Sequence, residues 1–524
     1  MKKNLLLTAA FCASLIANQA IAQTRYLDEI FTDVTVTPDI VYANNFSVIT
    51  GAPVAEDLKL DLYEPTGDSQ TDRPLILYLP TGSFLPRYFN QLPTGDIKDS
   101  ATVNMCERLA RQGYVVAAVS YRQGWNPQAA TQEMRAQTII QAVYRGLQDA
   151  KTAVRFFRSD VANNSNTYGI DDTRIAVGGQ GSGGYISLAY ATLNDVTEIQ
   201  LPKFYNVTDS AFMVDPAIMG DFSGLGGNAA LNNDNHNGYS DDILMTFNIG
   251  GALGDSTWLN AGEMPIVSIQ GEADAFAPYA FGMVTIPGTG GNVVEVSGAS
   301  DIIRIADAFG NNDVFKTPAI SDAYTTQADS YNTALDGTYG NGGNEGLYTF
   351  LGAANGNGPW EFWDDATVTA EVNYINSVLM TTLDPVVILG GGYASNPFYQ
   401  GLGPVAGKAR AMAYLDTIQG YLAPRLYRGL VGLTGNTSLS VTEFSATEVS
   451  VYPNPATDQI SFVSEDSNPI SSILFYSLEG KVVRTESNIN ATNIVVSNLD
   501  LPKGIYFANV RFKEGTTVKK IVIQ

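Results

Sequence analysis

Three polar side chains in this sequence are of the types that carry out acyl transfer: a serine, an aspartate and a histidine. Ser182 lies in the glycine-rich turn Gly179–Gly184, directly after the short apolar run Ile175–Val177. A serine hydroxyl becomes a nucleophile when an adjacent base accepts its proton and a third group orients that base. Asp274 is a candidate for the orienting carboxylate, and His236 is the one histidine of the sequence. The residue types therefore permit a serine hydrolase, provided that the fold brings all three together.

Alternating strands and helices are expected to position these residues. Continuous apolar runs predict buried strands at 74–80, 114–121, 174–177 and 265–270, and an alternating run predicts an antiparallel edge strand at 59–65. Apolar residues at helical spacing predict helices at 103–111, 131–159 and 407–430. This alternation predicts an α/β fold, with a mostly parallel sheet and flanking helices. The stretch from about 320 to 375 is rich in Gly, Asn and Tyr, and we expect an irregular insertion or cap there.

The order of these motifs resembles the α/β-hydrolases of the esterase/lipase group over roughly residues 55–300. The matching segments are, in chain order, 60–65 (early strand), 78–84 (oxyanion loop), 149–157 and 168–171 (helix and turn before the nucleophile strand) and 271–279 (acid loop). The resemblance implies Asp274 as the catalytic acid. It also implies an oxyanion site at Gly82, Ser83, Gly181 and Ser182, because the family uses backbone N–H groups from these two turns.

The sequence departs from this family at the nucleophile. The motif Gly-x-Ser-x-Gly is met in register by Gly179–Gly183, which places Gly181 where the serine should stand. Ser182 comes one residue later, and one step along a helix rotates a side chain by about 100°. We therefore expect Ser182 to contribute its backbone N–H rather than a nucleophilic hydroxyl.

The base is also out of place. In this family the histidine follows the acid along the chain, whereas His236 precedes Asp274. The loop expected to carry the histidine is 356–363, where Asn357 cannot act as a base at pH 7. Losing the nucleophile or the base of such a triad costs about 10⁶-fold in rate. Ordinary esterase turnover is therefore expected to be lost.

Three other patterns could bind a ligand: the glycine run 179–184, the asparagine loop 232–238 and the aromatic segment 360–363. The first also fits G-x-G-x-x-G, but the strand that a dinucleotide site needs does not follow. The second has calcium-loop spacing without the acidic ligands of such a loop, which favours a polar surface loop. The third could be an aromatic platform for a sugar, although core packing is the favoured explanation. We predict no cofactor and no metal.

Composition and the start of the chain indicate an exported, acidic protein. Residues 1–22 have the basic start, the apolar stretch and the small-residue cleavage site of a signal peptide. Once they are removed, Cys106 is the remaining cysteine, which excludes a disulfide within the chain. The net charge of −23 disfavours nucleic acids and anionic membranes as partners. No second apolar run is long enough to predict a transmembrane segment.

The end of the chain is a different kind of sequence. Residues 433–448, rich in Ser, Thr, Gly and Asn, predict a linker, and the short alternating runs of 449–524 predict a small all-β sandwich. Tyr452–Pro455, Leu478–Lys481 and Leu501–Tyr506 closely resemble the C-terminal sorting domain of type IX secretion substrates. The resemblance implies a Bacteroidetes-type bacterium, the type IX secretion machinery as partner, and a secreted protein that is extracellular or on the outer cell surface.

These inferences combine into one organisation: a signal peptide (1–22), an α/β-hydrolase-like domain (23–432), a linker (433–448) and a sorting domain (449–524). The predicted function is a secreted or cell-surface protein with an impaired esterase-like fold. It would bind a small ester-like or carbohydrate ligand in the remnant cleft. Two alternatives stay open. One is an active carboxylesterase or lipase-like hydrolase that uses Ser182 as nucleophile, and the other is a structural or adhesive surface protein.

Overall fold

The computed structural model describes residues 24–86, 95–274, 276–286, 290–351, 360–362, 369–370, 372–373, 376–377, 382, 403–432, 449–464, 469–476, 482–487, 489–497, 501–512 and 516–524. The expected signal peptide and the expected linker lie outside the described residues. The chain divides into two compact units, one of residues 1–320 and 324–437 and one of residues 321–323 and 438–524. Within the described residues, no helix is both long and apolar enough to cross a membrane.

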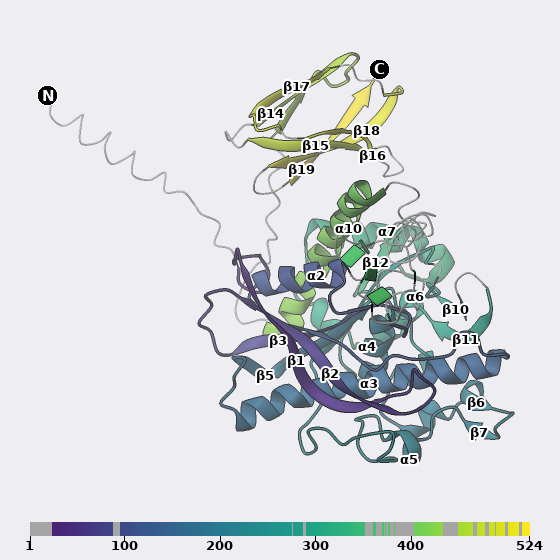
Figure 1. Cartoon of the computed structure of the whole chain (residues 1–524). Helices are drawn as coiled ribbons and strands as arrows, with labels where there is room; N and C mark the ends of the chain where they lie inside the picture. The colour runs from purple at the N-terminus through teal and green to yellow at the C-terminus, as the bar shows by residue number, and fades with distance from the viewer. Residues whose placement is uncertain are drawn as a thin grey trace. The chain divides into compact units, whose positions relative to one another are not determined.

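In the described part of the first unit, eight strands form one sheet in the order β1-β2-β4-β3-β5-β8-β9-β12. Their bounds are Val34–Ser47, Val54–Pro65, Val115–Val119, Arg73–Leu79, Ile170–Gln180, Met245–Ile249, Ile266–Gly271 and Leu347–Phe350, in that order. Figure 1 shows β1 and β2 as the long purple strands of this sheet. Strand β2 pairs antiparallel with β1 and β4, and every other pair in the sheet is parallel. The predicted mostly parallel sheet is confirmed.

Helices cover both faces of this sheet, as the sequence predicts. The longer ones are α2 (Ser100–Arg111), α3 (Gln132–Asn163), α4 (Ser182–Thr192), α6 (Ala299–Ala308), α7 (Ala323–Tyr339) and α10 (Gly403–Leu426). Helix α3 begins where the Thr131 hydroxyl accepts a hydrogen bond from the Met134 N–H, which satisfies a backbone donor that the helix itself cannot pair. Helices α3 and α4 pack on each other, whereas α2 packs against β2 and β4.

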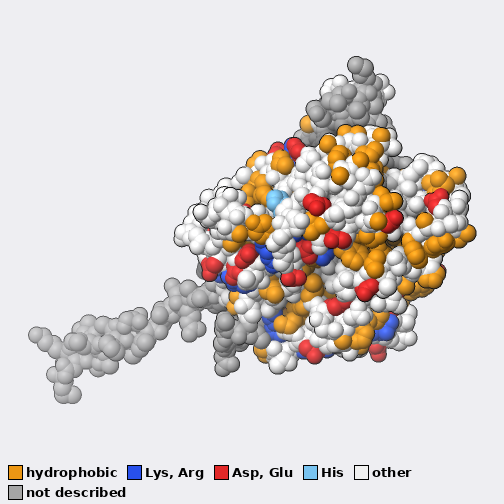
Figure 2. Space-filling model, turned by 90° about the horizontal axis from the view of Figure 1, so that it is seen from below, with side chains coloured by type: hydrophobic (Ala, Val, Ile, Leu, Met, Phe, Trp, Pro, Cys, Tyr) orange, Lys and Arg blue, Asp and Glu red, His pale blue; other side chains and the backbone are white. Residues whose placement is uncertain are grey.

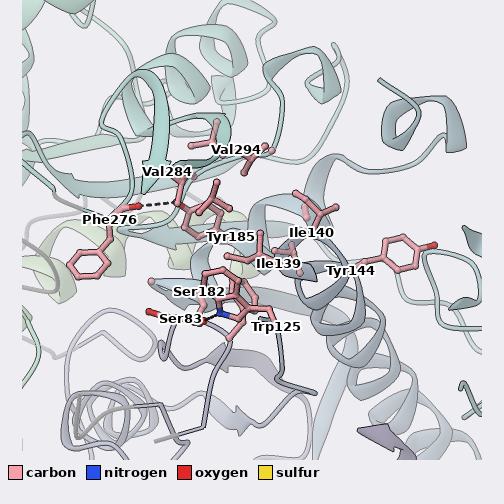
Figure 3. A pocket seen from close by; sticks show the side chains of 18 of the residues that line it. Ser83, Trp125, Ile139, Ile140, Tyr144, Ser182, Tyr185, Phe276, Val284 and Val294 are labelled. Atoms are coloured by element: carbon pink, nitrogen blue, oxygen red, sulfur yellow. Dashed lines mark hydrogen bonds between the residues drawn. The ribbon is translucent and has the colours of Figure 1, made fainter. Parts of the chain in front are cut away.

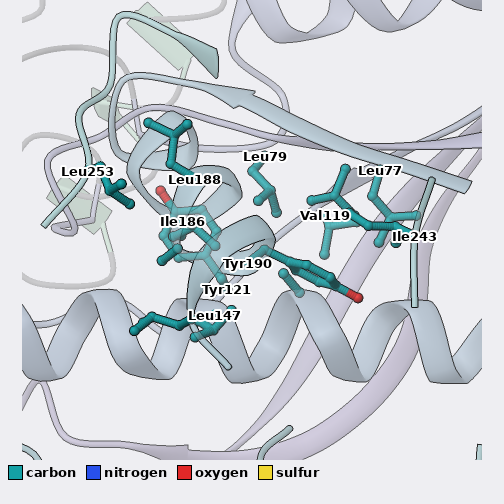
Figure 4. Close-up of a cluster of buried hydrophobic side chains, with 14 of the residues drawn as sticks. Leu77, Leu79, Val119, Tyr121, Leu147, Ile186, Leu188, Tyr190, Ile243 and Leu253 are labelled. Atoms are coloured by element: carbon teal, nitrogen blue, oxygen red, sulfur yellow. The ribbon is translucent and has the colours of Figure 1, made fainter. Parts of the chain in front are cut away.

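Alternate residues of the central strands point to opposite faces of the sheet. Leu77 and Leu79 of β3 and Val119 of β4 join Ile186 and Leu188 of α4 in one cluster of buried side chains (Figure 4). Burying a side chain of this size contributes about 1.5–3 kcal/mol. This cluster fixes α4 against the sheet, and therefore fixes the turn that precedes α4.

Two sequence-based expectations are wrong. The segment 59–65 is not an edge strand, because β1 pairs along its outer side. The region from about 320 to 375 is not simply irregular, since it contains α7 and β12, the last strand of the sheet. Helix α7 buries few of its residues and so lacks a strong apolar stripe, and β12 is only four residues long. The helical pattern of α7 and the short apolar run of β12 are therefore too weak to predict from a segment that is rich in Gly and Asn.

The second unit consists of antiparallel strands. Strands β13 (Val449–Tyr452), β14 (Gln459–Ser464) and β17 (Asn493–Ser497) form one sheet, and β16 (Val482–Glu486), β15 (Ile470–Tyr476), β18 (Gly504–Phe512) and β19 (Thr516–Ile523) form another. The rings of Phe462 and Phe475, one from each sheet, meet edge to face with centroids 5.8 Å apart. Two sheets that share one apolar core form a small β-sandwich, and the predicted all-β region is confirmed.

The surface agrees with the acidic composition. On the face seen in Figure 2, acidic side chains are scattered among hydrophobic ones, and no broad basic patch is visible.

Candidate functional site

The site is built at the carboxyl ends of the parallel strands, where open α/β sheets usually place their ligands. Thr81 follows β3, Gly181 follows β5, Gly250 follows β8, Asp274 follows β9 and Glu361 follows β12. Strands distant in the sequence therefore bring these residues to one edge of the sheet.

Gly181 occupies the sharp turn between β5 and α4. Its backbone has φ 54° and ψ −119°, a conformation that residues with a Cβ atom adopt only under strain. The Gly181 N–H donates to the Ile249 carbonyl at 2.8 Å, and the Gly181 carbonyl accepts from the Gly184 N–H at 2.9 Å. The turn thus has the shape expected of a nucleophile turn, although it carries no side chain.

The side chain of Thr81 fills the space where a nucleophile would begin. A Cβ atom added to Gly181 would lie 2.0 Å from Thr81 Oγ1 and 2.8 Å from Thr81 Cβ, closer than non-bonded atoms approach. The flanking glycine is equally constrained, because a Cβ atom on Gly183 would lie 2.1 Å from the Leu79 carbonyl oxygen. A serine at 181 is therefore incompatible with Thr81 in its present position.

Ser182 lies beside this turn with its hydroxyl already engaged. The side chain is buried, and Oγ forms a 2.9 Å hydrogen bond with the Tyr121 hydroxyl, which in turn donates to the Pro80 carbonyl at 2.8 Å. Since the Tyr121 proton goes to Pro80, Ser182 is the donor in their mutual bond. Burial raises the pKa of Tyr121 above its ordinary value, so the phenol stays neutral and cannot take a proton from Ser182.

The structure does not bring His236 to the other predicted site residues. His236 Nε2 lies 2.7 Å from the Tyr42 carbonyl oxygen, and the ring packs edge-on against Phe156 with centroids 5.6 Å apart. A carbonyl can only accept, so Nε2 is the donor. Neither of these contacts involves Ser182 or Asp274.

The asparagine loop around His236 is hydrogen-bonded to β1. Asn233 Nδ2 and Asn235 Nδ2 donate to the Asn44 carbonyl at 3.2 and 3.0 Å, and Asn235 Oδ1 accepts from the Asn44 N–H at 3.3 Å. These bonds use the amide groups whose spacing is similar to that of a calcium loop.

Asp274 has no histidine beside it in the described structure. Its carboxylate accepts the N–H groups of Phe276 and Ala277, at 2.8 and 3.0 Å, and so closes its own turn. The residue keeps part of its surface exposed, but the carboxylate is deep enough that burial raises its pKa to about 6. The predicted acid thus reaches the expected edge of the sheet, where it holds backbone groups.

Glu361 is the site residue that the sequence reasoning missed. It comes after β12 in the sequence, within the segment 356–363 where the family resemblance predicts the histidine, and the residue is 3% exposed. Among the described residues, no group forms a hydrogen bond with Oε2. Burial raises the pKa of Glu361 to about 8, and the charges of Asp99 and Asp274 add to this shift. Asn357 and Trp363 lie outside the described residues.

A cavity of about 120 Å³ lies at this edge of the sheet, and neither Asp274 nor His236 is among its described lining residues. Thr81, Gly82, Ser83, Gly181, Ser182 and Glu361 line its polar end, so the four residues of the predicted oxyanion site are brought together, although their role stays a prediction. The remaining wall is apolar, with Ile139 and Ile140 of α3 on one side and Val284 of β10 (Phe281–Thr285) and Val294 of β11 (Asn292–Ser297) on another (Figure 3). Trp125, which also lines the cavity, donates its indole N–H to the Ser83 carbonyl at 2.7 Å.

Known proteins resemble this chain in two separate regions. Residues 60–283 match the family BD-FAE, which is esterase-like and has the α/β-hydrolase fold, and residues 450–524 match the secretion system C-terminal sorting domain. No curated protein sequence is significantly similar to the chain.

Similar solved structures include esterase 2 of the planctomycete Thermogutta terrifontis. Its paraoxon-phosphorylated form is 16% identical, and the alignment covers 67% of this chain and 96% of that chain with a TM-score of 0.32. Its propionate-bound form is 15% identical, with 68% and 97% covered and a TM-score of 0.31.

The family matches confirm the resemblances drawn from the sequence. The sorting domain indicates export to the cell surface or the extracellular space, and it implies contact with the type IX secretion machinery. The chain is an exported protein that joins an esterase-like α/β-hydrolase region to a C-terminal sorting domain.

Proposed function

We propose that the hydrolase-like region binds a small, largely apolar ligand in the remnant cleft and does not hydrolyse it. The observation that carries this proposal is the position of Thr81, whose Oγ1 would lie 2.0 Å from a Cβ atom at residue 181. Triad hydrolysis needs a nucleophile on this turn. The space for its side chain is taken.

The proton-accepting groups support the same proposal. A triad needs a base that hydrogen-bonds to the nucleophile. His236 bonds to the Tyr42 carbonyl instead, and Ser182 bonds to a neutral Tyr121 phenol. Glu361 stands in the loop predicted for the base, but a carboxyl group with a pKa of about 8 is mostly protonated at pH 7 and does not accept a further proton.

One observation favours an alternative, an esterase that uses Ser182. This residue lines the same cavity as Glu361, so a carboxylate and a hydroxyl reach the same space. The alternative requires the Ser182 hydroxyl to leave Tyr121 and the Glu361 carboxyl to lose its proton.

The test is turnover of p-nitrophenyl butyrate by the full mature chain and its Ser182→Ala variant, together with labelling by a fluorophosphonate. We expect hydrolysis at the buffer rate and no labelling of either protein, while an active serine esterase treated in parallel is labelled. Hydrolysis that disappears in Ser182→Ala would overturn the proposal and establish Ser182 as the nucleophile.

A further inference from the structure

Glu361 differs from every other residue of the cavity wall. It is the only carboxyl group among the described residues that line the cavity, and the wall beyond the polar end is largely apolar. Its side chain is 3% exposed, and Oε2 is buried without a hydrogen-bond partner in the described structure. Native proteins pair nearly all such buried polar atoms, so an unpaired carboxyl oxygen on a residue that lines a cavity points to a partner that the described residues do not supply.

We propose that Glu361 is the recognition group of this cavity and donates a hydrogen bond from its carboxyl O–H to the carbonyl oxygen of an uncharged, apolar ligand. This inference rests on the proposed binding function and names the chemical class of its ligand. The apolar part of the wall contacts the body of the ligand, and the Glu361 O–H orients it.

The charges around Glu361 favour a neutral acceptor over an ion. Asp99, which precedes α2 and accepts the Gly95 and Asp96 N–H groups at 2.6 and 3.0 Å, raises the pKa of Glu361 through its charge, and so does Asp274 after β9. These two carboxylates disfavour an anionic ligand. A cationic ligand would need Glu361 to be ionised, but its pKa of about 8 keeps it mostly protonated at pH 7.

The size of the cavity restricts the ligand further. A dry apolar cavity of about 150 Å³ binds benzene, and this one measures about 120 Å³. Trp125, Trp258 and Tyr185 contribute aromatic surface to the wall. One small ring or a short alkyl chain with a single carbonyl group therefore fits these dimensions.

The experiment compares three probes that share one ring: acetophenone (neutral acceptor), toluene (no acceptor) and benzylamine (cation). Their dissociation constants for the full mature chain are measured by ligand-detected NMR at pH 6, 7 and 9. The variants are Glu361→Gln, which keeps an N–H donor but does not titrate, and Glu361→Leu, which removes the donor. Asp72→Asn is the matched control, because Asp72 is an exposed carboxylate away from the cavity.

We expect the wild-type chain to bind acetophenone about tenfold more tightly than toluene at pH 6, the effect of one good hydrogen bond. The preference should disappear in Glu361→Leu and persist in Glu361→Gln. In the wild-type chain and in Asp72→Asn it should decline between pH 7 and pH 9 as Glu361 ionises, whereas in Glu361→Gln it should not change with pH. If Glu361→Leu does not fold, the pH profiles of wild type and Glu361→Gln decide the question.

Two results would overturn this inference and leave the binding function standing. One is equal affinity for acetophenone and toluene at every pH. The other is preferential binding of benzylamine that Glu361→Gln abolishes, which would identify a cation site. If none of the three probes binds, the inference is wrong. The esterase assay tests the proposed absence of hydrolysis independently of this result.

Discussion

Replacing Glu361 with glutamine should change how the stability of the first unit depends on pH. A carboxyl group whose pKa is raised by folding binds its proton more tightly in the folded chain than in the unfolded one. Its contribution is fully present below the ordinary pKa of 4.5 and is lost as the pH rises through the folded value of about 8. Glutamine does not titrate, so Glu361→Gln should lack this loss.

The size of the effect follows from the shift. Between pH 5 and pH 8 the folded chain holds a proton that the unfolded chain has released, and each pH unit contributes about 1.4 kcal/mol, which gives about 4 kcal/mol in total. Relative to wild type, Glu361→Gln should therefore be more stable by about 4 kcal/mol at pH 9 than at pH 5.

The assay is urea unfolding at pH 5, 7 and 9, followed by tryptophan fluorescence. All four tryptophans lie in the first unit, so the signal reports that unit and not the tail. The other carboxyl groups with raised pKa values, Glu56 and Glu263 at about 7 and Asp274 at about 6, are present in both proteins and cancel in the difference. A constant difference between the two proteins at all three pH values would refute the reasoning, because it would mean that Glu361 is ionised or paired in the folded chain.

Gly181→Ser should lower stability by about 1–3 kcal/mol, because it combines a positive φ with overlap against Thr81, and Thr81→Gly in the same chain should recover part of this loss. Purely additive losses in urea unfolding would contradict the overlap. The double variant should still hydrolyse no p-nitrophenyl butyrate, since the serine would lack its base. His236→Ala should destabilise the fold by about 1 kcal/mol through the lost bond to the Tyr42 carbonyl and leave acetophenone binding unchanged, and a change in binding would place His236 in the site. Deletion of residues 449–524 should retain the protein in the periplasm, as fractionation would show, and undiminished export would exclude the tail as the sorting signal.

The sequence predicts those parts of the fold that produce strong local patterns. Strands β3 and β4 are largely apolar runs, and β5 contains the short apolar run Ile175–Val177. The turn at Gly181 follows from the glycines that the close approach of Leu79 requires. Strand β1 escapes prediction because polar residues interrupt its alternation and its pairing with β2 is irregular.

The site was harder to predict because its residues come together only through the sheet. Asp274 could be placed from its own loop, since the local sequence carries the resemblance. Glu361 could not be, because nothing within its segment shows that β12 joins β9 or that Glu361 lines the cavity. The local sequence did contain one signal, an acidic residue between Trp360 and Phe362. A glutamate between two large aromatic residues is either exposed or, if buried, usually has a binding or pairing partner.

The packing of Thr81 against Gly181 also has an evolutionary consequence. A serine introduced at 181 would overlap the Thr81 side chain, so the effect of one substitution depends on whether the other is present. Neither change alone, nor both together, supplies a base, which a third position would have to provide. Under the proposed function, no single substitution supplies both the serine at 181 and a base beside it. Substitutions in the cavity wall can therefore change the proposed ligand one at a time, whereas triad hydrolysis in this cavity requires coordinated changes at several positions.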